Sequence, residues 1–300
     1  MSTQRGWQIA GASALVTGAA RGIGAGIAKR LHERGANVAL VGLEPERLER
    51  LAMSLGERAI AIEADVSDLS ALEGAVDATL SRFGRIDIGI ANAGISFTGP
   101  LRTAPVAQVE RTFAVNLLGV WRTDRALIEA IVDSRGYLLN VASLAAASHA
   151  PMMGPYSASK AGVEALTDVL RMELSPFGAG VGCAYFGFID TDLVKAAFAM
   201  PSAAGMRRRM PAFVRNPAPL SKAIDALEKG IERRSARLWA PRWVAGAIAL
   251  RTIIQPLTER QVLSDPRTLQ QALTAAAESG ETDGQDPLLG VAARALEGEL

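Results

Sequence analysis

The stretch Ser13-Ala14-Leu15-Val16-Thr17-Gly18-Ala19-Ala20-Arg21-Gly22-Ile23-Gly24 decides the fold of this chain. It starts with a short apolar run, continues through three glycines and leads into the amphipathic segment 25–34. A strand, a glycine turn and a helix in this order place a phosphate on the free N–H groups at the helix start. Glycine is needed where the backbone approaches a ligand or takes positive φ. The stretch therefore predicts a dinucleotide site, with the spacing Gly-x-x-x-Gly-x-Gly rather than the more familiar Gly-x-Gly-x-x-Gly.

Short apolar runs and longer amphipathic segments alternate after this stretch. The predicted strands are 37–43, 59–64, 86–91, 137–141 and 181–186, and the predicted helices are 45–55, 69–82, 105–131, 161–174 and 220–234. This alternation predicts a parallel, doubly wound α/β sheet with helices on both faces. The residues that directly follow predicted strands include Gly18, Asp65, Asn92, Ser143 and Gly187. Such sheets bind their ligands at that edge.

Tyr156 and Lys160 are four residues apart at the start of a predicted helix. This spacing puts both side chains on one face, about 5–6 Å apart at Cβ. Because an ammonium favours the phenolate, we expect Lys160 to lower the pKa of Tyr156 from its usual value near 10. The pair would then exchange protons at neutral pH. By itself the spacing is a weak filter, because an exposed lysine and a half-buried tyrosine on an ordinary helix also produce it.

Composition is that of a folded domain with a large core, at 49% hydrophobic and 21% charged residues. A length of 300 residues fits one large domain or two small ones. The net charge of +1 offers no electrostatic case for nucleic acid. Arg207-Arg208-Arg209 is the only compact basic run, and we interpret it as a solvated loop.

The expected location is the cytoplasm. Cys183 is the only cysteine, which excludes an intrachain disulfide and suits a reducing compartment. Residues 1–11 contain no apolar core of signal-peptide length, and no stretch reaches the roughly 18 apolar residues of a membrane span.

Five motifs in order resemble the short-chain dehydrogenase/reductase family: Thr17 to Gly24, Asn92-Ala93-Gly94, Asn116, Ser143 and Tyr156-x-x-x-Lys160. The match runs from about Ala12 to Leu193, with weaker agreement to about Pro241. The resemblance implies a single Rossmann-type domain over 1–241 with a seven-stranded, mostly parallel sheet. It also implies a homodimer or homotetramer whose main interface uses the helices that carry Asn116 and Tyr156.

The resemblance further implies an NAD(P)-dependent oxidoreductase that acts on alcohols or ketones. Tyr156 would be the general acid in reduction and the base in oxidation. Lys160 would hydrogen-bond the nicotinamide ribose, and Ser143 would donate to the substrate oxygen. Asn116 would hold a water in a proton relay to Lys160.

The coenzyme contacts implied by the resemblance extend along the whole cleft. They are Gly18, Arg21, Gly22, Ile23, Gly24, Glu44, Asp65, Val66, Asn92, Gly94, Tyr156, Lys160, Ile189 and Thr191. Asp65 and the backbone of Val66 would meet the adenine, and Ile189 and Thr191 the carboxamide end.

The choice between NADP and NAD stays open, with NADP favoured. Gly42 stands where NAD-preferring members carry an aspartate, and Arg21 can meet a 2′-phosphate. Against this, Glu44 lies close by, and Leu43 occupies a position where many NADP users have arginine. A further departure is Phe186-Gly187 in place of Pro-Gly, which affects the path of the local loop.

Residues 193–215 take the place of the family's substrate loop. The predicted substrate contacts are His149, Met152, Met153, Phe188, Phe198 and Met206, with Met200, Met210 and Phe213 as further apolar residues. Flexible apolar side chains predict a sizeable hydrophobic alcohol or ketone. The alternative is that they merely pack the loop.

Residues 242–300 form an extension, predicted as a partly apolar helix followed by a flexible tail with a linker near 278–286. Residues 243–257 are too apolar for free exposure, so we expect burial against a partner subunit or the substrate cleft. A helix resting on a membrane surface, with Arg242 and Arg251 at the headgroups, is less favoured.

Two other functions stay open. A non-catalytic dinucleotide sensor or scaffold could share the fold, because a fold does not determine function. Such a sensor has no need of the serine, tyrosine and lysine set. An epimerase or dehydratase of the extended branch would normally show Gly-x-x-Gly-x-x-Gly, which this glycine loop lacks. No metal site is predicted.

Overall fold

The computed structural model describes residues 7–199 and 212–278. These residues form a seven-stranded sheet in the order β3-β2-β1-β4-β5-β6-β7, with every neighbouring pair parallel. The strands are β1 (Ser13–Thr17), β2 (Asn37–Gly42), β3 (Ala59–Glu63), β4 (Ile88–Ala91), β5 (Tyr137–Val141), β6 (Gly180–Phe186) and β7 (Arg237–Ala240). The predicted doubly wound fold is confirmed. The strand order reverses between β1 and β4, and such switch points bind ligands.

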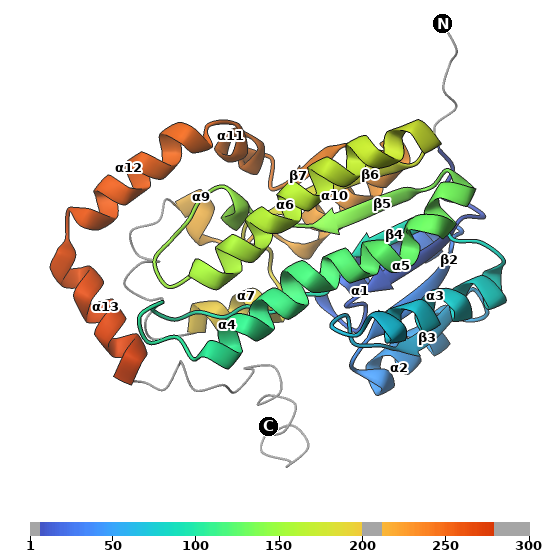
Figure 1. The fold of residues 1–300 in the computed structure, drawn as a ribbon, viewed down its shortest axis with the longest axis horizontal. Coiled ribbons are helices and arrows are strands. Elements are labelled where there is room, and N and C mark those ends of the chain that lie inside the picture. Colours follow the sequence, from blue (N-terminus) through green and yellow to red (C-terminus); the bar gives the residue numbers. More distant parts are fainter. Residues whose placement is uncertain (1–6, 200–211, 279–300) are drawn as a thin grey trace, which may run out of the picture.

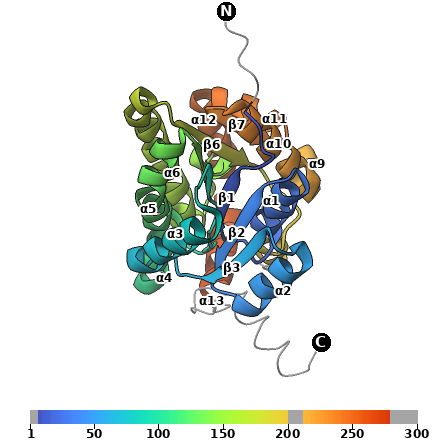
Figure 2. The same cartoon turned by 90° about the vertical axis from the view of Figure 1, so that its right-hand side faces the viewer.

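Helices cover both faces of the sheet, as Figures 1 and 2 show. One layer contains α1 (Gly22–Glu33), α2 (Pro45–Leu55) and α10 (Leu220–Arg233). The other contains α3 (Leu69–Phe83), α5 (Gly119–Ser134) and α6 (Gly154–Leu174). Because both faces are covered, β1, β2, β4 and β5 are buried along almost their whole length, which explains their continuous apolar runs.

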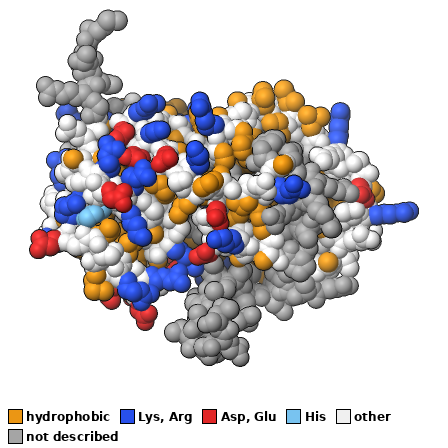
Figure 3. All heavy atoms as spheres, turned by 180° about the vertical axis from the view of Figure 1, so that it is seen from behind, with side chains coloured by type: hydrophobic (Ala, Val, Ile, Leu, Met, Phe, Trp, Pro, Cys, Tyr) orange, Lys and Arg blue, Asp and Glu red, His pale blue; other side chains and the backbone are white. Residues whose placement is uncertain are grey.

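A separate apolar core fills the space between the sheet and each helical layer. Leu31 of α1 and Leu227 of α10 pack under one face, and Leu127 of α5 packs under the other. Each such buried side chain contributes about 1.5–3 kcal/mol. On the outer surface, Arg30 and Arg34 of α1 pair with Glu228 of α10. Charged side chains gather over this part of the surface in Figure 3.

The predicted helix 105–131 is divided in the structure. It consists of α4 (Val106–Phe113), a π-helical turn over Ala114–Leu118, and α5. The π turn contains Asn116, and such turns are frequent at functional sites. In contrast, α6 starts at Gly154, so Tyr156 lies in its first turn.

The C-terminal part differs from the prediction of one apolar helix followed by a tail. The chain passes through α7 (Asp192–Ala199), α9 (Ala212–Arg215), α10 and β7 into α11 (Trp243–Ala249), α12 (Arg251–Leu263) and α13 (Pro266–Glu278). A separate α13 forms because Asp265 accepts from the Thr268 N–H ahead of a first-position proline. The expected linker after residue 278 lies outside the described residues. Within the described ranges, no helix has the length and apolarity needed to cross a membrane.

Candidate active site and coenzyme cleft

The glycine loop between β1 and α1 leaves no room for a side chain at Gly18 or Gly24. Gly18 and Gly22 have φ angles of +64° and +56°, in the left-handed region. A Cβ on Gly24 would lie 2.2 Å from the carbonyl oxygen of Gly18. Within the described residues, no side chain caps the first turn of α1, which includes Ile23. Its free N–H groups can therefore bind a phosphate, and the loop fits a dinucleotide.

Asn92 ties the end of β4 to the glycine loop. Its side-chain amide donates to the carbonyl oxygen of Thr17 at 3.0 Å. The Thr17 hydroxyl accepts from the N–H groups of Asn92 and Ala93 at 3.0 and 3.2 Å. These contacts set the separation of the two strand ends, so Asn92 shapes the wall of the cleft.

Asn116 is fully buried and bonds the backbone just after Asn92-Ala93-Gly94. Its Oδ1 accepts from the Ile95 N–H at 2.8 Å, and its Nδ2 donates to the Ile95 oxygen at 2.9 Å. A Cβ on Gly94 would lie 3.3 Å from Asn116 Oδ1 and 3.6 Å from Lys160 Nζ. The amide of Asn116 thus holds this loop beside Lys160, and its part in a water relay stays a prediction.

Ser143, Tyr156 and Lys160 meet at the carboxyl end of β5. Ser143 follows β5 and caps a short 3₁₀ turn by accepting from the Ala145 N–H at 3.1 Å. The Ser143 hydroxyl donates to the carbonyl oxygen of Phe186 at 3.4 Å, and it also acts on the Tyr156 phenol, whose pKa it lowers. Lys160 is 4% exposed, and its Nζ lies 5.8 Å from the centroid of the Tyr156 ring. The predicted helix spacing therefore brings Tyr156 and Lys160 together, and the end of β5 places Ser143 at the same site.

The expected effect of Lys160 on Tyr156 is corrected by the structure. Burial raises the pKa of Tyr156, and the hydrogen bond with Ser143 is what opposes this rise. Lys160 Nζ donates to the carbonyl oxygen of Val141 at 2.8 Å. Burial also lowers the pKa of Lys160 itself to about 8, which weakens its ammonium character. The surroundings of Tyr156 thus oppose ionisation of its phenol.

The residues expected at the adenosine end lie along the ends of β2 and β3. Arg21 Nη2 lies 3.1 Å from Glu44 Oε1, and each side chain is about one-third exposed. The Asp65 carboxylate accepts from the Ser67 N–H at 2.8 Å. The side chain of Val66 is buried against Gly119 of α5, which leaves its backbone for the cleft.

The segment after β6 reaches back to the glycine loop. Ile189 is 1% exposed and forms an isolated parallel bridge with Ala218. A Cβ on Gly22 would lie 3.7 Å from Thr191 Cγ2. Residues from opposite ends of the domain are thereby brought to one cleft.

A cavity of about 620 Å³ opens at this edge, within the size range of small-molecule sites. Ser143 and Tyr156 are among its polar lining residues. Most of the lining is apolar: Leu144, Ala145, Ala150, Pro151, Met153, Phe186, Phe188, Leu193, Val194, Ala197, Val214, Trp243, Ala247, Ile254, Val262, Leu269 and Ala272.

The predicted substrate residues are only partly in this cavity. His149, Met153 and Phe188 line it. Met152 is 4% exposed and is not among the lining residues, and its backbone has a positive φ of +67°. Phe198 packs on Phe188 with ring centroids 4.8 Å apart, and Met206 lies outside the described residues.

The sequence did not identify the lining residues of α12 and α13. Thr258, Gln261, Val262, Leu269 and Ala272 all face the cavity. The only indication in the sequence was the apolar character of residues 243–257. It predicted burial of this segment, either against a partner subunit or against the substrate cleft, without choosing between the two. Polar residues such as Gln261 carried no signal at all.

The short chain dehydrogenase family profile matches residues 12–202. Subunit BbsD of (2S)-[(R)-hydroxy(phenyl)methyl]succinyl-CoA dehydrogenase from Thauera aromatica is 35% identical over 184 residues, which cover 60% of this chain and 74% of that relative. A short chain dehydrogenase from Burkholderia cenocepacia in complex with NADP has a TM-score of 0.70 at 32% identity, covering 78% of this chain and 97% of that one.

The 3-ketoacyl-(acyl-carrier-protein) reductase from Brucella melitensis complexed with NADH has a TM-score of 0.68 at 28% identity, covering 77% of this chain and 97% of that one. The chain belongs to the short-chain dehydrogenase/reductase family. It is an oxidoreductase of that family, and its structural relatives bind NAD or NADP.

Proposed function

We propose that this protein transfers hydride between a nicotinamide coenzyme and the alcohol or ketone carbon of a hydrophobic substrate, with Tyr156 as general acid and base. The observation that carries the proposal is the pairing of Ser143 and Tyr156 within an otherwise mostly apolar cavity. Two hydroxyl groups that can meet one substrate oxygen are what carbonyl reduction requires.

The residues at the cleft fit a dinucleotide, because the loop has no room for side chains at Gly18 and Gly24 and presents the first turn of α1. The coenzyme, when bound, supplies or accepts the hydride. Ser143 donates a hydrogen bond to the substrate oxygen and stabilises its developing charge. Tyr156 gives its proton to that oxygen during reduction and takes it back during oxidation.

The decisive experiment replaces Tyr156 by phenylalanine. We expect Tyr156→Phe to lose turnover by about 10²–10⁴-fold, the usual range for a general acid, while it binds reduced coenzyme like wild type. Tyr137→Phe is the matched control, because it removes a buried hydroxyl that lies outside the cavity lining. If wild type binds coenzyme but turns over no ketone in a broad panel, the sensor or scaffold function holds instead.

The substrate class is tested with ketones of graded size. The mostly apolar lining and the volume of the cavity support large aromatic or polycyclic compounds over small charged ones. We expect kcat/KM to rise with the apolar area of the ketone. Activity confined to small, charged carbonyl compounds would discard the hydrophobic substrate.

For the coenzyme we propose NADP, bound through Arg21. A partly exposed ion pair such as Arg21–Glu44 contributes about 0–1 kcal/mol, so Arg21 can turn from Glu44 to a 2′-phosphate at little cost. Arg21→Ala should weaken NADPH binding far more than NADH binding. Glu44→Gln should strengthen NADPH binding, since it removes a negative charge near the phosphate. Equal effects on both coenzymes would exclude this preference.

We also propose that the chain forms a homodimer or homotetramer through α5 and α6, as the family resemblance implies. Trp121 of α5 is 46% exposed, and Val169 and Met172 of α6 are 47% and 67% exposed. Exposed apolar patches of this kind mark protein interfaces. Light scattering should show a smaller particle for Met172→Glu and no change for Met53→Glu, a 73% exposed control on α2. The cytoplasmic location stays a prediction.

A further inference from the structure

Helix α12 lies beyond the residues that match the family, yet it forms a wall of the cavity. Ile254, Thr258, Gln261 and Val262 line the cavity and share one side of the helix. Figure 1 shows α12 at the end of the molecule toward which the strands point. The extension therefore contributes directly to the space where we propose that substrate binds.

Burial alone does not hold α12 in this place. None of its residues is buried, and Ile253 and Leu257 are 58% and 56% exposed. Hydrophobic side chains also gather on the surface at this end of the molecule in Figure 3. Because hydrophobic stabilisation scales with the apolar area removed from water, α12 gains little of it. Its position must depend on specific polar contacts.

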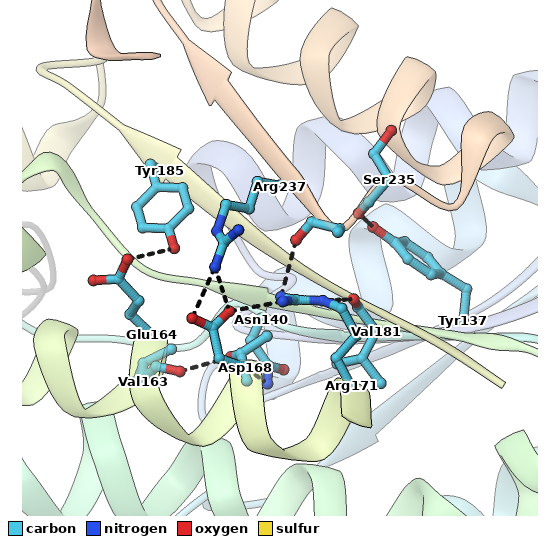
Figure 4. Close-up of polar contacts among 12 residues, drawn as sticks. Tyr137, Asn140, Val163, Glu164, Asp168, Arg171, Val181, Tyr185, Ser235 and Arg237 are labelled. Atoms are coloured by element: carbon cyan, nitrogen blue, oxygen red, sulfur yellow. Dashed lines mark hydrogen bonds and ion pairs between the residues drawn. The ribbon is translucent and has the colours of Figure 1, made fainter. Parts of the chain in front are cut away.

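The first contact joins Arg251, at the start of α12, to Glu164 of the catalytic helix α6. The guanidinium donates to both carboxylate oxygens, at 2.7 and 2.8 Å. Glu164 is 7% exposed and lies one turn after Lys160. The Tyr185 hydroxyl also donates to Glu164 at 2.9 Å, as Figure 4 shows. The Arg251 side chain is 40% exposed, but the carboxylate that it meets is buried, and bidentate geometry of this kind fixes orientation as well as distance.

The second contact joins Gln255 to the loop between Ser143 and Tyr156. Its Oε1 accepts from the His149 N–H at 2.8 Å, and its Nε2 donates to the His149 oxygen at 3.4 Å. Arg251 and Gln255 are four residues apart and therefore lie on the same side of α12. Arg251 joins α12 to the catalytic helix, and Gln255 joins α12 to the loop that leads into that helix.

We propose that Arg251 and Gln255 are positioning residues that determine substrate size, because they hold α12 as a fixed wall of the cavity. The proposal rests on the proposed function, since it concerns the substrate of the same site. A large apolar ketone extends from Ser143 and Tyr156 to α12 and depends on both contacts. A small ketone fills only the end of the cavity near Ser143 and Tyr156, so its binding does not depend on these contacts.

The test uses the full chain with Arg251→Met and Gln255→Ala, assayed with one polycyclic and one small cyclic ketone. For each variant we expect KM for the polycyclic ketone to rise about tenfold or more, with kcat and the KM for the small ketone nearly unchanged. Arg251→Lys keeps a charge that reaches Glu164 and should restore part of the KM. Arg260→Met is the control on the same helix, because Arg260 is not in the cavity lining or in either contact.

Hydrogen exchange of the backbone amides of residues 251–263 measures how firmly these contacts hold α12, and it needs no turnover. In Arg251→Met and Gln255→Ala, we expect at least about tenfold faster exchange in α12 and unchanged exchange in the sheet. Unchanged exchange in both variants would overturn the proposal, as would faster exchange with equal effects on both ketones. If wild type reduces no ketone, the proposed function fails, and the exchange data still decide whether these residues hold α12.

Discussion

The buried carboxyl of Asp124 predicts an unusual dependence of stability on pH. Asp124 on α5 is 4% exposed, and its Oδ2 accepts from Asn140 Nδ2 on β5 at 2.7 Å. Asn140 also donates to the hydroxyl of Thr167 on α6. Within the described residues, Oδ1 of Asp124 and Oδ1 of Asn140 have no partner. Oδ1 of Asp124 therefore has no donor in the described part of the chain that would stabilise a negative charge on this carboxylate.

Burial raises the pKa of Asp124 from its ordinary value of 3.8 to about 7. Between these two values the folded state holds more protons than the unfolded state, so stability falls as pH rises. A difference of about three pH units corresponds to about 4 kcal/mol in total, at 1.36 kcal/mol for each. About 2.5 kcal/mol of this is lost between pH 5 and 7.5.

Asp124→Asn provides the test, because an amide resembles the protonated acid in shape and stays neutral. We expect its free energy of unfolding to exceed that of wild type by an amount that grows by about 2.5 kcal/mol from pH 5 to 7.5. The assay is urea unfolding at fixed protein concentration across this range, since all other titrating groups cancel in the difference. A difference that stays constant with pH would refute the reasoning, because Asp124 would then be ionised in the folded protein throughout.

Three other changes give distinct results. Lys160→Met should abolish turnover and also remove a gain of about 2 kcal/mol in stability that wild type shows between pH 8 and 10, where the unfolded state holds more protons; urea unfolding at these two pH values checks it. Gly24→Ala should lower stability by about 1–3 kcal/mol and impair coenzyme binding, measured by thermal unfolding with and without NADPH, because its Cβ would meet the Gly18 oxygen. Tyr137→Phe should lower stability by about 1–3 kcal/mol in the same melts with turnover retained, since the Ser235 oxygen loses its donor.

Local sequence patterns predicted the order of strands and helices well. The apolar runs and the glycine loop were sufficient to predict this order, because each depends only on the few residues around it. Asn116 shows the limit of such patterns. Its position in a helix was predicted. The π turn around it and its two hydrogen bonds with Ile95 are visible only in the tertiary structure. Met152 shows the same limit, because neither its burial outside the cavity lining nor its positive φ could be predicted from its neighbours in the chain.

By itself the sequence determined the α/β class, the glycine loop and the tyrosine–lysine spacing. These depend on local propensity and periodicity, which neighbouring residues specify. Only the tertiary structure decided the direction of the pKa of Tyr156, the pairing of Arg21 with Glu44, and the place of α12 against the cavity. Each of these depends on burial or on contacts between residues distant in the chain. Arg251 and Glu164 are 87 positions apart, and no local pattern reports such a contact.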